Sequence, residues 1–174
     1  MQNSANCNVE ILHLFISPGH NFLGHFGKPP DDHPAEERSQ IQCEAGLGIV
    51  GDRYFSHEKN FKGQITFFDQ EVFERMRDQF DLPACPPSAM RRNVLLRGID
   101  LSQLIGRRFQ VQGIEFEGTE ECRPCFWMNQ AVAPGAEEFL QGKGGLRARI
   151  ISGGRLQTGP CELTLMHRQD HHAN

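Results

Sequence analysis

Residues 93–118 read NVLLRGIDLSQLIGRRFQVQGIEFEG, in which short apolar runs alternate with turns that contain glycine. Short apolar runs bounded by such turns are typical of strands, and we expect strands at 93–97, 108–112 and 114–118. Similar runs lie on both sides of this stretch, at 9–16, 38–43, 63–68, 146–151 and 162–166. The chain therefore favours a fold that is built mainly from short strands.

A helix is expected at 70–80, where apolar residues recur at helical spacing and Asp69 is placed to cap the first turn. The proline-rich segment 82–87 ends it, because proline removes a backbone donor and restricts the residue before it. A second helix is expected at 136–141. Many short strands with inserted helices predict a mostly β fold, either a barrel or a sandwich.

The length of 174 residues is typical of one domain, so we expect a single domain over 1–174. Eighteen Lys and Arg against 22 Asp and Glu give a net charge of -4, which argues against a nucleic-acid or membrane partner. The apolar run 9–16 is too short to span a membrane and follows no basic segment, so we expect a cytoplasmic protein. We also expect a long loop at 17–34 and a frayed tail at 167–174.

Two of the six cysteines, Cys122 and Cys125, stand close together in the motif Cys-Arg-Pro-Cys. A thiol beside Arg123 has its thiolate form favoured, and the thiolate is both the nucleophile and the ligand of soft metals. The alternatives are two ordinary thiols, a redox pair or half of a zinc site. The sequence contains no second Cys-x-x-Cys pair and no His-Glu-x-x-His motif to complete a zinc site.

Arg91, Arg92 and Asn93 form a second cluster, which we join to Arg53 in the glycine-rich segment 46–53. Neighbouring arginines beside glycine-rich turns suggest a bound anion, because guanidinium groups match phosphate oxygens bidentately. The alternative is a solvated face on which the arginines pair with the surplus carboxylates. No P-loop or dinucleotide-binding fingerprint accompanies the cluster.

An ordered series of motifs runs along the chain: GDR at 51–53, KGQITF at 62–67, RRNVLLRG at 91–98, LIG at 104–106, RPC at 123–125 and GGRLQTG at 153–159. In order and spacing this series resembles the MOSC domain over about residues 46–165. That domain forms the C-terminus of molybdenum cofactor sulfurases and also occurs in amidoxime-reducing components and in small stand-alone bacterial proteins. The ordered series is far more specific than any one motif.

The resemblance implies a β-barrel similar to the one inserted in pyruvate kinase, and a pterin-type molybdenum cofactor. It also implies that Cys125 is the catalytic cysteine and metal ligand, since it matches the cysteine that binds molybdenum in the reductases and is proposed to carry a persulfide in the sulfurases. The candidate cofactor-binding residues are Arg53, Arg91, Arg92, Asn93 and Arg123.

The chain shows neither the pyridoxal-phosphate-binding portion nor the ferredoxin-like domain of larger family members, so we expect sulfur or electrons to come from another protein. Three hypotheses follow. The first is a molybdenum-dependent reductase of N-hydroxylated small molecules. The second is a sulfur or cofactor carrier in which Cys125 holds a persulfide, and the third is a non-catalytic binding module. Whether the chain is an enzyme is left open between them.

Overall fold

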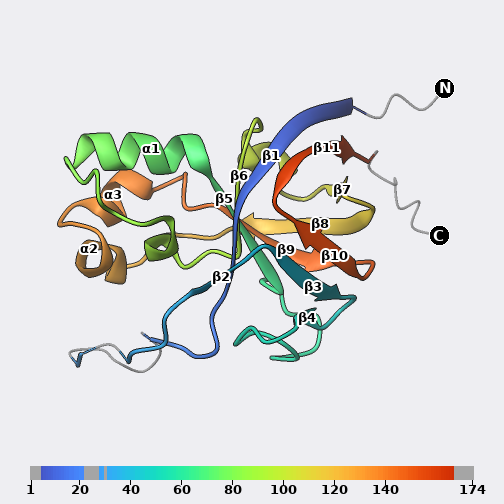
Figure 1. Ribbon diagram of the computed structural model, residues 1–174, viewed down its shortest axis with the longest axis horizontal. Coiled ribbons are helices and arrows are strands. Elements are labelled where there is room, and N and C mark those ends of the chain that lie inside the picture. Colours follow the sequence, from blue (N-terminus) through green and yellow to red (C-terminus); the bar gives the residue numbers. More distant parts are fainter. Residues whose placement is uncertain (1–4, 22–27, 30, 167–174) are drawn as a thin grey trace, which may run out of the picture.

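The computed structural model describes residues 5–21, 28, 29 and 31–166. Seven strands form a closed barrel in the order β11-β7-β8-β9-β5-β6-β1, with β1 pairing back to β11 (Figure 1). These strands are β1 (Ala5–Ile16), β5 (Ile65–Asp69), β6 (Val94–Arg97), β7 (Arg108–Val111), β8 (Ile114–Glu121), β9 (Leu146–Ile150) and β11 (Gly159–Leu165). All neighbours pair antiparallel except β5 and β6, which are parallel.

The long strand β1 closes the barrel because it pairs along both of its edges. Its first part pairs with β11 from Ala5 to Ile11, and its second part pairs with β6 up to Leu14, with a register shift after Ile11. Its last residues pair with β2 (Glu36–Arg38). A separate small sheet has the order β10-β3-β4, formed by β10 (Gly154–Gln157), β3 (Gln40–Glu44) and β4 (Gly48–Ile49).

The barrel interior is filled by aliphatic side chains and by three phenylalanines. Phe67, Phe109 and Phe116 are at most 1% exposed, and their ring centroids lie 5.4 to 5.7 Å apart. Edge-to-face and offset arrangements at this spacing stabilise aromatic clusters beyond simple area burial. The Phe-rich composition of the chain therefore serves the core of the barrel.

Three α-helices gather on one side of the barrel, as Figure 1 shows: α1 (Gln70–Gln79), α2 (Trp127–Ala131) and α3 (Ala136–Leu140). The described residues also form two 3-10 helices, η1 (Pro87–Met90) and η2 (Leu101–Leu104). A second apolar cluster, which includes Phe68, Phe73, Met76 and Leu140, packs the helices against the outside of β5 and β6. In the described part of the chain, no helix has the length and apolar character needed to cross a membrane.

The structure confirms the mostly β fold with inserted helices. The helices expected at 70–80 and 136–141 form at Gln70–Gln79 and Ala136–Leu140, and Asp69 caps the first by accepting the Val72 N–H at 3.1 Å. The short elements β4, β10 and α2 were not expected, because each is too brief to show a period in the sequence. The expected loop at 17–34 is described only at 17–21, 28, 29 and 31–34, and the tail at 167–174 lies outside the described residues.

The capping residue Asp69 also makes the stability of the fold depend on pH. Burial and a hydrogen bond with Glu71 raise the pKa of Asp69 to about 6, while the pKa of Glu71 is lowered. Between about pH 4 and 6 the folded chain retains a proton on Asp69 that the unfolded chain releases. The contribution of Asp69 to the free energy of unfolding therefore falls as the pH rises through this window.

We expect Asp69→Asn to remove this contribution while keeping a good N-cap. The variant should unfold at a higher urea concentration than the wild type at pH 7, and its midpoint should change less between pH 4 and 6. Asp78→Asn, an exposed change on the same helix, is the control and should follow the wild-type pH dependence. If the urea midpoints of the wild type and of Asp69→Asn change with pH in the same way, Asp69 does not cause the pH dependence of stability.

Candidate functional site

A cavity of about 350 Å³ lies where the start of β6 and the end of β8 meet the segments that follow β1 and β4. Segments that are far apart in the sequence contribute to its walls. The lining residues are His20, Asn21, Arg53, Tyr54, Phe61, Gly63, Thr66, Met90, Arg91, Arg92, Cys122, Arg123, Cys125, Trp127, Met128 and Arg147. Five of them are arginines, and none is an aspartate or a glutamate.

Both cysteines of the Cys-Arg-Pro-Cys motif line this cavity, but they differ in exposure. Cys122 follows β8 directly, is 6% exposed and donates its N–H to the Gly145 carbonyl oxygen at 2.8 Å. Cys125 is exposed, and its carbonyl oxygen accepts the Met128 N–H of α2 at 2.9 Å. A thiol must be accessible to bind a metal or to attack, so Cys125 is the better placed of the two. In the part of the chain that the structure describes, no group of three or more His, Cys, Asp or Glu could hold a metal ion.

The Arg92 guanidinium group holds the cysteine segment in place. Its Nε donates to the Gly144 carbonyl oxygen at 3.1 Å. Its terminal nitrogens donate to the carbonyl oxygens of Met90 at 2.9 Å and of Cys122 at 3.2 Å. Gly144 packs so tightly against the segment that a Cβ there would lie 2.2 Å from the Cys122 oxygen. Arg92 thus ties the start of β6 to the backbone that carries both thiols.

The neighbouring Arg91 reaches in a different direction, because its backbone is left-handed with a φ of 50°. Its guanidinium group donates to the carbonyl oxygens of His33 at 2.8 Å and of Gly19 at 3.1 Å, which secures the segment after β1. Burial and the positive charge of Arg53 lower the pKa of Arg91 to about 10. Burial contributes most to this shift in pKa, the neighbouring Arg53 adds to it, and the Asp52 carboxylate opposes it.

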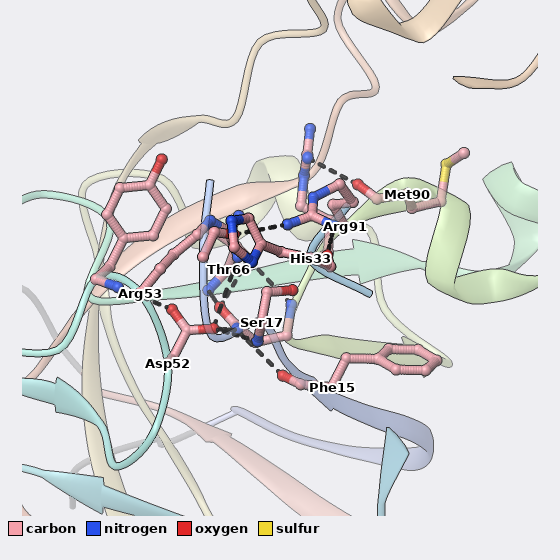
Figure 2. A network of polar contacts seen from close by, with 12 residues as sticks. Phe15, Ser17, His33, Asp52, Arg53, Thr66, Met90 and Arg91 are labelled. Carbon is pink, nitrogen blue, oxygen red and sulfur yellow. Dashed lines mark hydrogen bonds and ion pairs between the residues drawn. The ribbon is translucent and has the colours of Figure 1, made fainter. Parts of the chain in front are cut away.

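A buried carboxylate, that of Asp52, holds the arginine side of the cavity together (Figure 2). It accepts hydrogen bonds from the backbone N–H groups of Ser17 at 3.0 Å and Tyr54 at 3.1 Å. It also accepts from Asn93 Nδ2 at 3.2 Å, and it lies 3.7 Å from the Arg53 guanidinium group. Asp52 therefore joins the end of β1, the start of β6 and the segment after β4.

Asn93 belongs to this network and does not line the cavity. Its side-chain oxygen accepts from the backbone and hydroxyl of Thr66 at 3.0 and 2.9 Å. Its Nδ2 also donates to the Phe15 carbonyl oxygen at 3.2 Å. With every polar atom of its buried side chain bonded inside the protein, Asn93 positions strands.

The remaining arginines of the cavity are Arg53, Arg123 and Arg147. The Arg53 side chain is 13% exposed, whereas Arg123 is exposed and its guanidinium group has no partner among the described residues. Arg147 lies 3.3 Å from a carboxylate oxygen of Glu120. Burial alone would lower the pKa of Arg147, but Cys122 and Glu120 outweigh it and raise this pKa. Arg147 is therefore a cation that faces the sulfur of Cys122.

An aromatic wall completes the cavity. The Tyr54 ring stacks on Phe61 at 5.1 Å and meets the His20 ring edge-on at 5.0 Å. The Arg53 guanidinium carbon lies 4.7 Å from the centre of the Tyr54 ring, within the range of a cation–π contact. Burial, followed by the charges of Arg53 and His57, lowers the pKa of His20. The imidazolium of His20 therefore gives up its proton more readily than that of free histidine.

The structure brings five of the six residues expected from the sequence to one cavity: Cys125, Arg53, Arg91, Arg92 and Arg123. Five further lining residues were not expected from the sequence: His20, Tyr54, Phe61, Trp127 and Arg147. One signal for two of them was available in the composition. The chain has 13 Phe but only one Tyr and one Trp, and both of these amphipathic rings lie in the cavity.

A larger cavity of about 600 Å³ lies beside the start of α1 and the turn that follows β6. Carboxylates and cations share its walls, among them Asp69, Glu71, Arg75, Asp100 and Lys143. It is lined by no cysteine and by none of the residues expected from the sequence to bind a cofactor. The smaller, arginine-lined cavity is therefore the candidate site.

We expect Arg92→Ala to affect mainly stability and Arg123→Ala to affect mainly ligand binding. Arg92→Ala leaves three carbonyl groups without their donor and should lower the free energy of unfolding by roughly 2–3 kcal/mol. It should also expose Cys122 to alkylation by iodoacetamide. Arg123→Ala should leave stability within about 0.5 kcal/mol. It should nevertheless weaken the binding of pyrophosphate about tenfold, measured through the fluorescence of Trp127. Equal stability of the two variants would contradict the positioning role of Arg92.

We expect Asp52→Ala to lower the free energy of unfolding by about 3–5 kcal/mol, because the largely buried Arg53 loses its counter-charge and two backbone N–H groups lose their acceptor. Urea unfolding measures this change. Asp32→Ala, which removes an exposed carboxylate, is the control and should stay close to the wild type. If the two variants unfold at the same urea concentration, the Asp52 network does not stabilise the fold.

Comparison with known proteins agrees with the fold and the motifs. The family model of the MOSC domain matches residues 33–160. The structure of YuaD from Bacillus subtilis superposes with a TM-score of 0.74 at 17% identity and covers 97% of this chain and 100% of that one. No curated protein matches the chain significantly.

Two structures of YiiM are also similar. The one from Escherichia coli has a TM-score of 0.60 at 17% identity and covers 94% of this chain and 71% of that one. The one from Geobacillus stearothermophilus has a TM-score of 0.65 at 14% identity and covers 94% and 77%. At these identities the structures establish a shared fold, while the family model covers most of the chain. The chain therefore belongs to the MOSC domain family.

Proposed function

We propose that the arginine-lined cavity binds a pterin-type molybdenum cofactor through Cys125 and that the protein reduces N-hydroxylated small molecules. One observation carries this proposal: an accessible thiol and five arginines line one cavity whose lining residues include no carboxylate. Since the whole chain has a net charge of -4, this is a local concentration of positive charge against the overall balance. It favours an anionic ligand that also has a soft atom for sulfur to bind.

The chemistry of the lining residues fits each part of that cofactor. A cysteinate is a suitable ligand for molybdenum, which is a soft metal in its sulfur-rich cofactor. A phosphate group matches the guanidinium groups of Arg53, Arg123 and Arg147, which are not committed to backbone carbonyl groups. A planar pterin ring suits a cavity with the rings of Tyr54 and Trp127 in its walls.

The bound cofactor would supply the two-electron redox chemistry. In this proposal a separate donor protein supplies the electrons, because the given sequence shows no flavin, haem or iron–sulfur motif. The protein's own residues hold the cofactor, exclude water from the buried side of the cavity and admit a small substrate.

We expect Cys125→Ser to abolish molybdenum loading, because the hydroxyl is a much weaker ligand for a soft metal than the thiolate. The protein is produced in cells that make the cofactor, and molybdenum is measured by mass spectrometry together with the fluorescence of the released, oxidised pterin. Cys85→Ser, outside the cavity, is the control and should load like the wild type. Full loading of Cys125→Ser with loss in Cys122→Ser would reverse the assignment of the two thiols.

Activity is tested on the loaded wild type with benzamidoxime as substrate and reduced methyl viologen as electron donor. The expected result is reduction to benzamidine, with Cys125→Ser inactive. A protein that contains molybdenum but reduces no N-hydroxylated compound would overturn the reductase proposal.

A second function is favoured by the exposure of the cysteine. Cys125 is exposed and the next residue, Phe126, is 57% exposed, so a protein partner can reach the thiol directly. A sulfur carrier needs such access, because a desulfurase must place a persulfide on the thiol. Labelled sulfur that transfers to Cys125 in a protein without reductase activity would favour this carrier function.

A further inference from the structure

We propose that His20 is the proton donor of this site, a role that rests on the proposed reductase function. Reductive cleavage of an N-hydroxylated compound follows R–NH–OH + 2 e⁻ + 2 H⁺ → R–NH₂ + H₂O. The N–O bond breaks, and the oxygen leaves as water. The two electrons come from the external donor. One proton passes from the His20 imidazolium to the departing oxygen, and the other reaches the nitrogen from solvent.

The composition of the cavity points to His20. Its ionisable lining residues are five arginines, two cysteines, one tyrosine and one histidine. Guanidinium groups stay protonated at all physiological pH values, and thiols and phenols ordinarily titrate above pH 8. Imidazole is the side chain that both gives and takes a proton between pH 5 and 8. Among the described residues that line the cavity, His20 is the one histidine.

The position of His20 is set by neighbours on separate segments. It follows β1, in the segment that Arg91 secures through the carbonyl oxygen of Gly19, the residue directly before it. Its ring meets Tyr54 edge-on at 5.0 Å, and the ring of His57 lies 6.4 Å away. These contacts hold the imidazole in the cavity wall, where a bound substrate can meet it.

Burial and the charges around His20 make its imidazolium a stronger acid than that of free histidine. Burial lowers its pKa most, the charges of Arg53, His57 and Arg91 lower it further, and Asp52 opposes them. The cation gives up its proton more readily than free histidine does, and solvent restores it after each turnover. Because the protonated form is the active one, the rate falls as the pH rises above the pKa of His20.

Two histidine variants test the proposal. His20→Gln removes the titrating group and keeps a polar side chain of similar size. His57→Gln is the matched control, because His57 is an exposed neighbour of the same aromatic cluster but does not line the cavity. Both variants should contain as much molybdenum and pterin as the wild type, which separates a loss of proton donation from a loss of cofactor.

With loaded protein and benzamidoxime, His20→Gln should lower kcat about 100-fold or more, as expected for the loss of a general acid, with KM nearly unchanged. The decline of the wild-type rate with rising pH should disappear. His57→Gln should keep the wild-type kcat at the low-pH plateau, and the decline of its rate should move to higher pH because a charge that lowers the His20 pKa has been removed. Added imidazole should restore part of the activity of His20→Ala.

The pKa of His20 can also be measured without turnover. The imidazole proton resonances of the protein without cofactor should show His20 titrating below pH 6.5, and at a higher pH in His57→Gln. A His20→Gln variant with wild-type kcat and pH profile would overturn the role of His20 and leave the reductase function intact. A loaded wild type that reduces no N-hydroxylated compound would overturn the reductase function, and the role of His20 with it.

Discussion

The buried carboxylate of Asp52 is the interaction on which the site depends. It accepts hydrogen bonds from Ser17 at the end of β1, from Asn93 at the start of β6 and from Tyr54 in the segment after β4. These segments belong to the two neighbouring strands that complete the barrel and to the wall of the cavity. A carboxylate removed from water is costly unless several donors meet it, so the three segments stabilise one another only when all are in place.

The cavity stays cationic in an acidic protein because of the kind of hydrogen-bond acceptor that its arginines use. Among the described residues, Arg91 and Arg92 donate to five backbone carbonyl groups, which satisfy these N–H donors without adding a negative charge. Carboxylate acceptors would have satisfied the same N–H donors but would also have neutralised the positive charge of the guanidinium groups. The pKa of Arg91 is lowered to about 10 by burial first and by the nearby charge of Arg53 second. Structural hydrogen bonds and an attractive potential for anions are thus obtained from the same two side chains.

The elements that could be predicted from the sequence are those with a regular spacing of apolar residues or with a capping residue. The helix that begins after Asp69 and the strands around residues 93–118 follow from spacing and from turns. The directions of Arg91, Arg92 and Asn93 were not predictable. Arg91 ends η1 with a left-handed backbone before β6 begins, and the three consecutive side chains reach the segment after β1, the cysteine segment and the buried network.

The aromatic wall of the cavity could not be predicted from the sequence for a different reason. His20, Tyr54 and Trp127 come from segments without regular secondary structure or from the start of a five-residue helix, where no spacing rule applies. What brings them together is closure of the barrel, which places the segment after β1 beside those after β4 and β8. Irregular segments can hold such side chains because the rigid strands that flank them fix where each segment starts and ends. The chemistry of the site is therefore carried by loops, and its geometry by the barrel.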